Sequence, residues 1–150
     1  VARAEVRVDD EVVGAIDRGF LLLVGLHASD GEAEVAWMAE KVATLRVFED
    51  ETGRMNLPLD AVGGRCLCVS QFTLAGAVAK GRRPSFDGAL GPDRARPLFE
   101  RFTALLADRV GPVATGRFGA KMTVSLVNDG PVTMVLDSTD MARSRRGSAD

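Results

Sequence analysis

The sequence predicts an α/β fold of the mixed, mainly antiparallel kind, with a β-barrel-like sheet and two packed helices. Stretches with strand character outnumber the two stretches with helical periodicity, and the second of these lies late in the chain, between strands. The chain has 150 residues, enough for one domain with its own core, and no repeat or linker divides it. We therefore expect one domain over residues 1–138 and a polar, disordered tail over residues 139–150.

The first half predicts three elements. Residues 4–16 alternate between apolar and polar side chains around an Asp-Asp turn, which is typical of a β-hairpin. Residues 20–27, "FLLLVGLH", predict a strand that is buried on both faces. Residues 32–47 carry apolar side chains every three or four positions and predict an amphipathic helix, with Asp30 as its N-cap.

The second half predicts a central strand, a loop, a helix and two more strands. Residues 65–74, "RCLCVSQFTL", are rich in residues that favour β-structure. Residues 75–91 have the Gly, Pro and Ser content of a long loop. A helix is expected over residues 92–110, where a proline suits the first position. Residues 114–129 and 131–138 are expected to form the last two strands.

Composition limits the location and partners of the chain. The formal net charge of −2 gives no overall attraction to nucleic acid, so DNA is not expected as a partner and any basic site must be local. No apolar run approaches the ~20 residues of a membrane span. The first ten residues lack the apolar segment of a secretion signal, and Cys66 and Cys68 are typical of buried thiols in a reducing compartment. We therefore expect a cytoplasmic protein.

Common catalytic patterns are missing from the sequence. His27 is the only histidine, it ends an apolar stretch, and no partner motif makes it a general base. There is no phosphate-binding loop, dinucleotide fingerprint or metal-ligand spacing, so we expect no metal and no organic cofactor. A hydrolase that uses Cys66 or Cys68 is disfavoured because it would lack a base.

Two polar stretches remain as candidate sites. In "SQFTL", residues 70–74, a strand would place Ser70 and Thr73 on opposite faces, which is compatible with a solvated strand end or with a site. In "KGRRPSF", residues 80–86, cations in a flexible loop are suited to phosphate groups, although such charges are also common on protein surfaces. The three cations are Lys80, Arg82 and Arg83.

Five stretches together resemble the D-aminoacyl-tRNA deacylase family, in their order and spacing, over residues 1–138. They are "LRVFEDETGRMN", "VSQFTL", "KGRRPSF", "TGRFGAKMTVSLVNDGPVT" and "LDS". "SQFTL" and "NDGPVT" resemble the two signature motifs of that family. The resemblance implies a homodimer with active sites at the subunit interface. It also implies hydrolysis of the ester that joins a D-amino acid, or glycine, to the 3′-terminal adenosine of tRNA, as quality control in translation.

The resemblance also implies roles for individual residues. The pocket near the scissile ester would be lined by Ser70, Gln71, Phe72 and Thr73, and tRNA would be contacted by Lys80, Arg82 and Arg83. Substrate binding and chiral selection would involve Asn128, Gly130 and Pro131. The Gly130–Pro131 bond would be a cis peptide that is inserted from the partner subunit. Its carbonyl oxygens would accept a hydrogen bond from the α-amino group of the substrate, and its bulk would exclude an L side chain.

The source of catalysis is open between two explanations. Thr73 can act as a nucleophile, but a hydroxyl without a base is weak. We favour the explanation implied by the resemblance, in which the 2′-hydroxyl of the tRNA activates water and N–H groups around Gln71 and Phe72 stabilise the oxyanion. A different class of function is a non-catalytic RNA-binding or dimerisation module that uses the cations of residues 80–83.

Overall fold

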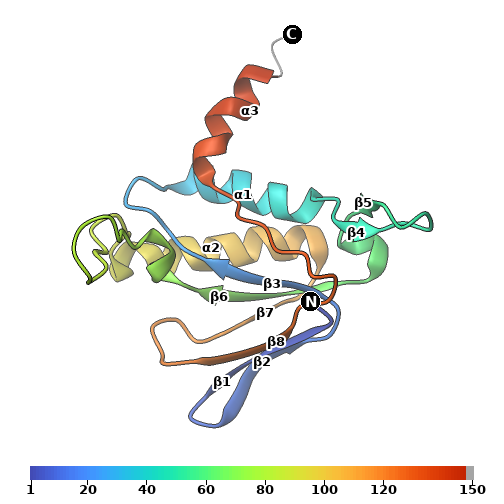
Figure 1. The fold of residues 1–150 in the computed structure, drawn as a ribbon, viewed down its shortest axis with the longest axis horizontal. Coiled ribbons are helices and arrows are strands. Elements are labelled where there is room, and N and C mark those ends of the chain that lie inside the picture. Colours follow the sequence, from blue (N-terminus) through green and yellow to red (C-terminus); the bar gives the residue numbers. More distant parts are fainter. Residues whose placement is uncertain (148–150) are drawn as a thin grey trace.

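The computed structural model describes residues 1–147 and has two large helices packed on layered sheets. Figure 1 shows helices α1 (Glu32–Thr44) and α2 (Pro92–Val110) lying over one sheet, with a second sheet beneath it. The mixed α/β class and the two packed helices are therefore confirmed. Residues 1–147 contain no closed barrel: the strands form separate sheets of three, three and two strands.

The N-terminal hairpin is confirmed and belongs to an antiparallel sheet. Strands β1 (Arg3–Val8) and β2 (Glu11–Ile16) pair directly, and β8 (Thr123–Val127) adds to the other edge of β1. The two turn residues, Asp9 and Asp10, have φ of 49° and 65°. Positive φ at both central positions matches the twist of a two-residue hairpin, which explains the Asp-Asp pair.

The second sheet is parallel, which the sequence analysis did not predict. It has the order β3 (Gly19–Val24), β6 (Arg65–Ser70), β7 (Val113–Thr115), and both pairings are parallel. The reason is connectivity, because α1 lies between β3 and β6 in the chain and α2 lies between β6 and β7, as parallel crossovers require. The prediction of a mixed, mainly antiparallel arrangement holds for the described residues as a whole, because three of their five strand pairings are antiparallel, but it does not hold for this sheet taken alone.

Strand β6 joins the two hydrophobic cores. Cys66 and Cys68 face the helices in a cluster with residues such as Leu106, while the alternate residues Leu67 and Val69 pack on the β1 side. These four side chains of β6 are all fully or almost fully buried. The sheets also approach closely through their backbones, because a Cβ on Gly14 of β2 would lie 2.3 Å from the carbonyl oxygen of Thr115 in β7.

Strand β3 is more exposed than expected. It is an edge strand of its sheet, and Leu23 remains 47% exposed in the single chain. The prediction of a strand buried on both faces is therefore wrong for one chain on its own. It applies instead to β6, which lies in the centre of the sheet.

Helix α1 begins at the predicted position 32 but ends at Thr44, three residues early, and its N-cap is not the predicted one. Its N-cap is Gly31, whose N–H donates to the Glu34 carboxylate at 2.9 Å. Asp30 is buried and instead accepts the backbone N–H of His27 at 2.7 Å and the hydroxyl of Ser138 at 2.8 Å. Helix α2 has the predicted bounds and continues through the internal proline at position 97.

A small hairpin follows α1 and is closed by one carboxylate. Strands β4 (Phe48–Glu49) and β5 (Met55–Leu57) flank the loop, and the short helix η1 (Asp60–Val62) follows them. Asp50 accepts hydrogen bonds from the Thr52 hydroxyl at 2.6 Å and from the backbone N–H groups of Thr52 and Arg54. These bonds, above all the one from the Thr52 hydroxyl, lower the pKa of Asp50 to about 2.

The C-terminal part departs from the predictions. Residues 131–137 pair with no strand within the described residues, so the expected last strand is not formed there. The short helices η3 (Ser138–Asp140) and α3 (Met141–Gly147) occupy most of the segment that was expected to be disordered, and Figure 1 shows α3 rising away from α1. Residues 148–150 of that segment lie outside the described residues. No helix in the described part is long and apolar enough to cross a membrane.

Candidate active site

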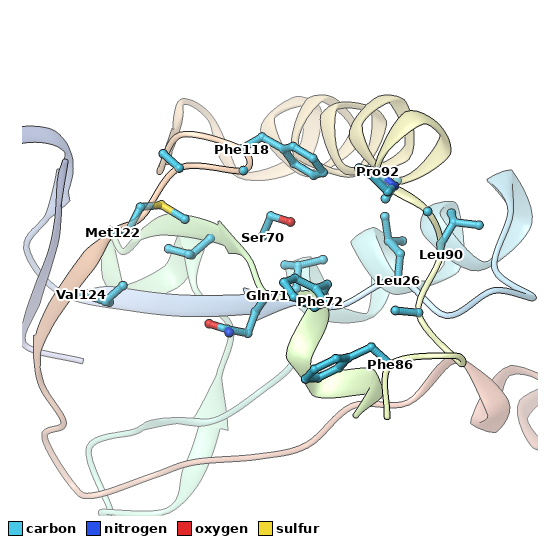
Figure 2. Close-up of a pocket in the computed structure, with 17 residues that line it drawn as sticks. Leu26, Ser70, Gln71, Phe72, Phe86, Leu90, Pro92, Phe118, Met122 and Val124 are labelled. Atoms are coloured by element: carbon cyan, nitrogen blue, oxygen red, sulfur yellow. The ribbon is translucent and has the colours of Figure 1, made fainter. Parts of the chain in front are cut away.

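A cavity of about 560 Å³ lies at the carboxyl ends of the parallel strands. Val24, the last residue of β3, pairs with Ser70, the last residue of β6, and both line the cavity. The carboxyl edge of a parallel sheet is a common position for ligand sites, because the loops that follow the strands meet there. Figure 2 shows the start of α2 and the loop after β7 on the other sides of the cavity.

The polar part of the cavity wall comes from the "SQFTL" stretch. Ser70, Gln71 and Phe72 all line the cavity (Figure 2). The chain leaves the strand at this point and forms the short helix η2 (Phe72–Ala75). The expected alternation of Ser70 and Thr73 across a strand is therefore wrong, because the strand has ended before Thr73 is reached.

Hydrogen bonds fix the Gln71 backbone and side chain. Its N–H donates to the carbonyl oxygen of Val24 at 2.8 Å and continues the parallel ladder. Its Nε2 donates to Thr73 Oγ1 at 2.5 Å. A Cβ on Gly25 would lie 2.9 Å from the Gln71 carbonyl oxygen, so only glycine fits beside this turn. Thr73 does not line the cavity but is coupled to it through Gln71.

Aromatic rings close two sides of the cavity. Phe72 and Phe86 meet edge to face with ring centroids 5.1 Å apart. Figure 2 shows Phe118 on the opposite side of the cavity from Phe86. Phe118 packs against Phe99 with centroids 6.1 Å apart, and the Arg96 guanidinium lies 4.9 Å from the Phe118 centroid.

The cavity lining is neutral. It is composed of apolar residues, glycines, Ser70 and Gln71, and within the described residues no ionisable side chain lines it. Burial raises the pKa of the Cys66 thiol to about 12 and also raises the pKa of Cys68, so both remain protonated at neutral pH. Residues 1–147 assemble no group of three His, Cys, Asp or Glu side chains that could hold a metal ion.

The loop with Lys80, Arg82 and Arg83 begins beside the cavity. Ala77 and Ser85 exchange two backbone hydrogen bonds of 2.8 and 2.9 Å, which close the base of this loop. The next residue, Phe86, lines the cavity. The three cations are exposed on the far side of the closing hydrogen bonds, and none of them lines the cavity.

The "NDGPVT" stretch lies at a different cavity of the same chain. The Gly130–Pro131 bond is cis, as expected, and Asn128 Nδ2 donates to Thr133 Oγ1 at 2.8 Å across the turn. Asn128 and Thr133 line a second cavity of about 250 Å³, together with apolar residues of β3 and of the end of α1. Within one chain the two motifs are therefore not brought together.

The sequence analysis did not find the part of the cavity formed by Leu90, Pro92 and Ala95, at the start of α2. A signal was present, because the order strand, helix, strand, helix, strand over β3 to β7 is typical of a parallel sheet. Because ligand sites are common at the carboxyl edge of a parallel sheet, this order predicts a site beside the segment that joins β6 to α2.

Comparisons with known proteins identify relatives of this chain. The family model described as D-Tyr-tRNA(Tyr) deacylase matches residues 1–137. A protein of Geobacter metallireducens named D-aminoacyl-tRNA deacylase is 57% identical over 92% of this chain and 91% of its own length. One of the same name from Thermus aquaticus is 56% identical over 95% of this chain and 93% of its own length.

Solved structures show the same fold. A structure titled c-Myc DNA Unwinding Element Binding Protein has a TM-score of 0.86 and 39% identity, and covers 91% of this chain and 93% of its own. A probable eukaryotic D-amino acid tRNA deacylase has a TM-score of 0.76 at 17% identity, over 86% of this chain and 90% of its own, and supports the fold alone. The match of the family model over nearly the whole chain, and these identities, establish that the chain belongs to the D-Tyr-tRNA(Tyr) deacylase family of hydrolases.

Proposed function

We propose that the protein hydrolyses the ester between a D-amino acid and the 3′-terminal adenosine of tRNA, releasing the free D-amino acid and tRNA. Glycine on tRNA is a second substrate of the same reaction, and the function is quality control of translation in the cytoplasm. The observation that carries the proposal is the neutral cavity walled by Ser70, Gln71 and Phe72 in a member of this family. Its volume of about 560 Å³ is in the usual range for a small-molecule site.

The neutral lining favours catalysis assisted by the substrate. Water attacks the ester carbonyl carbon, the bond from that carbon to the ribose oxygen breaks, and the ribose oxygen receives a proton. No side chain of the cavity wall is a general base, so the 2′-hydroxyl of the terminal adenosine takes the role of activating the water. Thr73 is a positioning residue in this scheme, because its hydroxyl accepts the amide N–H of Gln71.

Two backbone features support one choice of oxyanion donor. The N–H of Gln71 is already bonded to Val24, so it is not available to the oxyanion. Phe72 is the first residue of η2, and the first N–H groups of a helical turn have no acceptor within the turn. The Phe72 N–H is therefore the donor we assign to the developing negative charge.

Chiral selection is proposed to require a second subunit. Asn128, Gly130 and Pro131 of one subunit enter the cavity of its partner, where the Gly130–Pro131 backbone refuses an L side chain and accepts glycine. The separation of the two motifs within one chain supports this arrangement. A homodimer would also cover exposed apolar side chains of β3, of the end of β8 and of the segment after β8, which include Leu23, Leu126, Val127, Met134 and Val135.

The test is hydrolysis of tRNA charged with a D-amino acid, the matching L-amino acid or glycine by the same enzyme preparation. We expect turnover of the D-aminoacyl and glycyl substrates and none of the L-aminoacyl substrate. Equal hydrolysis of the D and L forms would contradict chiral selection. Hydrolysis of neither, with tRNA binding retained, would favour the non-catalytic RNA-binding module, in which Lys80, Arg82 and Arg83 serve binding alone.

A further inference from the structure

Arg96, Arg117 and Lys121 form a basic lip on the Phe118 side of the cavity. The Arg96 guanidinium lies 4.9 Å from the centroid of the Phe118 ring, and that ring lines the cavity. Arg117 and Lys121 flank residues 118–120, which are also part of the lining, and all three cations are exposed. Figure 2 shows Phe118 across the cavity from Phe86, so the lip beside Phe118 lies opposite Phe86 and the basic loop, the segment of residues 77–85 that carries Lys80, Arg82 and Arg83.

Arg96 differs from two other arginines on helix α2. Further along α2, Arg101 pairs with Glu32 of α1 at 2.6 Å, and Arg109 pairs with Glu40. Within residues 1–147 no ion pair involves any cation of the basic lip. The cations distant from the cavity therefore join the two helices, while those of the lip are available to a ligand.

Positive charge is concentrated around this cavity. The segments 79–96 and 117–122 contain seven cations and two acids, whereas the whole chain has a formal net charge of −2. The lining of the cavity itself is neutral, so direct ion pairs with these cations are open to ligand groups that project from the cavity, not to the end bound inside it. A ligand with a neutral tip and an anionic continuation matches this distribution.

We propose that the basic lip binds the phosphodiester groups of the nucleotides that precede the terminal adenosine of the aminoacyl-tRNA. This inference rests on the proposed function. The single-stranded 3′ end passes between the basic lip and the loop of residues 75–91, and its aminoacylated end enters the neutral cavity. The Arg96 guanidinium lies over the Phe118 ring and is exposed, so its N–H donors are available to phosphate oxygens.

The test compares two substrates that differ in these phosphates: D-aminoacyl-tRNA and the D-aminoacyl ester of adenosine. We expect Arg96→Ala and Lys121→Ala each to raise KM for the tRNA about two- to fivefold, the size of an exposed ionic contact, without changing kcat. Arg96→Lys should retain most of the affinity. The adenosine ester should be hydrolysed equally well by all variants.

Arg101→Ala is the matched control, since it removes the same charge from the same helix away from the cavity. The salt dependence of tRNA binding should fall by about 0.7 in log–log slope for each lip cation removed, and not for the control. Equal effects of Arg96→Ala and Arg101→Ala, or an equal loss on the adenosine ester, would overturn the basic lip as a phosphate site.

Binding of uncharged tRNA, followed by fluorescence anisotropy, separates this inference from the proposed function. If the affinity for tRNA depends on the lip residues but D-aminoacyl-tRNA is not hydrolysed, the proposed hydrolase function is contradicted and the lip remains an RNA contact. Turnover of D-aminoacyl-tRNA with an affinity that is independent of all three lip residues would support the hydrolase and overturn the lip as an RNA contact.

Discussion

The hydroxyl of Ser138 donates a 2.8 Å hydrogen bond to the buried carboxylate of Asp30, across 108 positions of the chain. The other oxygen of that carboxylate accepts the backbone N–H of His27 at 2.7 Å. Asp30 thus fastens the end of the segment that carries Gly130 and Pro131 to the start of α1. Ser138 is also the first residue of the short helix η3, which leads directly into α3.

Replacing this carboxylate should destabilise the fold. Asp30→Ala leaves the His27 N–H and the Ser138 hydroxyl without their acceptor, and we expect the free energy of unfolding to fall by about 2 to 3 kcal/mol. Urea denaturation measures it. Ser138→Ala, which removes one donor only, should cost less, and Asp30→Asn should lie between them because it keeps one acceptor oxygen. An unchanged midpoint for Asp30→Ala would show that the contact is dispensable.

Thr73→Ala separates the two catalytic explanations. If Thr73 only orients Gln71, its loss removes one neutral hydrogen bond, and kcat should fall about five- to tenfold. Loss of a true nucleophile would lower kcat by about a thousandfold or more. Single-turnover hydrolysis of D-aminoacyl-tRNA distinguishes these outcomes. D-aminoacyl-tRNA with a 2′-deoxy terminal adenosine should not be hydrolysed by the unmodified enzyme or by Thr73→Ala, because it lacks the hydroxyl that activates the water.

Val135→Glu tests the proposed homodimer. Val135 is 93% exposed in one chain, so a glutamate there should not disturb the fold of the subunit. In a dimer it would place an unpaired charge in the interface, and we expect dissociation to become at least about a hundredfold more favourable. Light scattering after size exclusion measures the mass. Val78→Glu, at a 76% exposed position of the basic loop, is the control and should leave the mass unchanged.

Asp50 should make stability depend on pH. Its pKa is about 2 in the folded protein and near the usual 3.8 when unfolded, so the carboxylate form is favoured by folding. This contribution is complete above pH 3.8 and is lost as the pH falls toward 2. Asp50→Asn should therefore lower the urea midpoint at pH 7 more than at pH 2.5. An equal difference at both pH values would show that hydrogen bonding to Thr52 does not depend on the charge.

Most of the local elements follow from sequence patterns alone. Periodicity of three to four predicts α1 and α2, and alternation around Asp9 and Asp10 predicts the first hairpin, because these patterns depend on neighbours in the chain. Residue chemistry similarly indicated the "SQFTL" stretch, of which Ser70, Gln71 and Phe72 do line the cavity.

How these elements pack together depends instead on contacts between distant parts of the chain. The parallel order of β3, β6 and β7 follows from crossovers through the helices, which a residue-by-residue pattern does not reveal. Asp30 has the sequence context of an N-cap, yet it bonds to Ser138, because its partner lies far along the chain. Likewise, the turn after Gln71 and the separation of "NDGPVT" from the cavity depend on packing between distant segments. Local propensities carry no information on such long-range contacts, which fix the shape of the site.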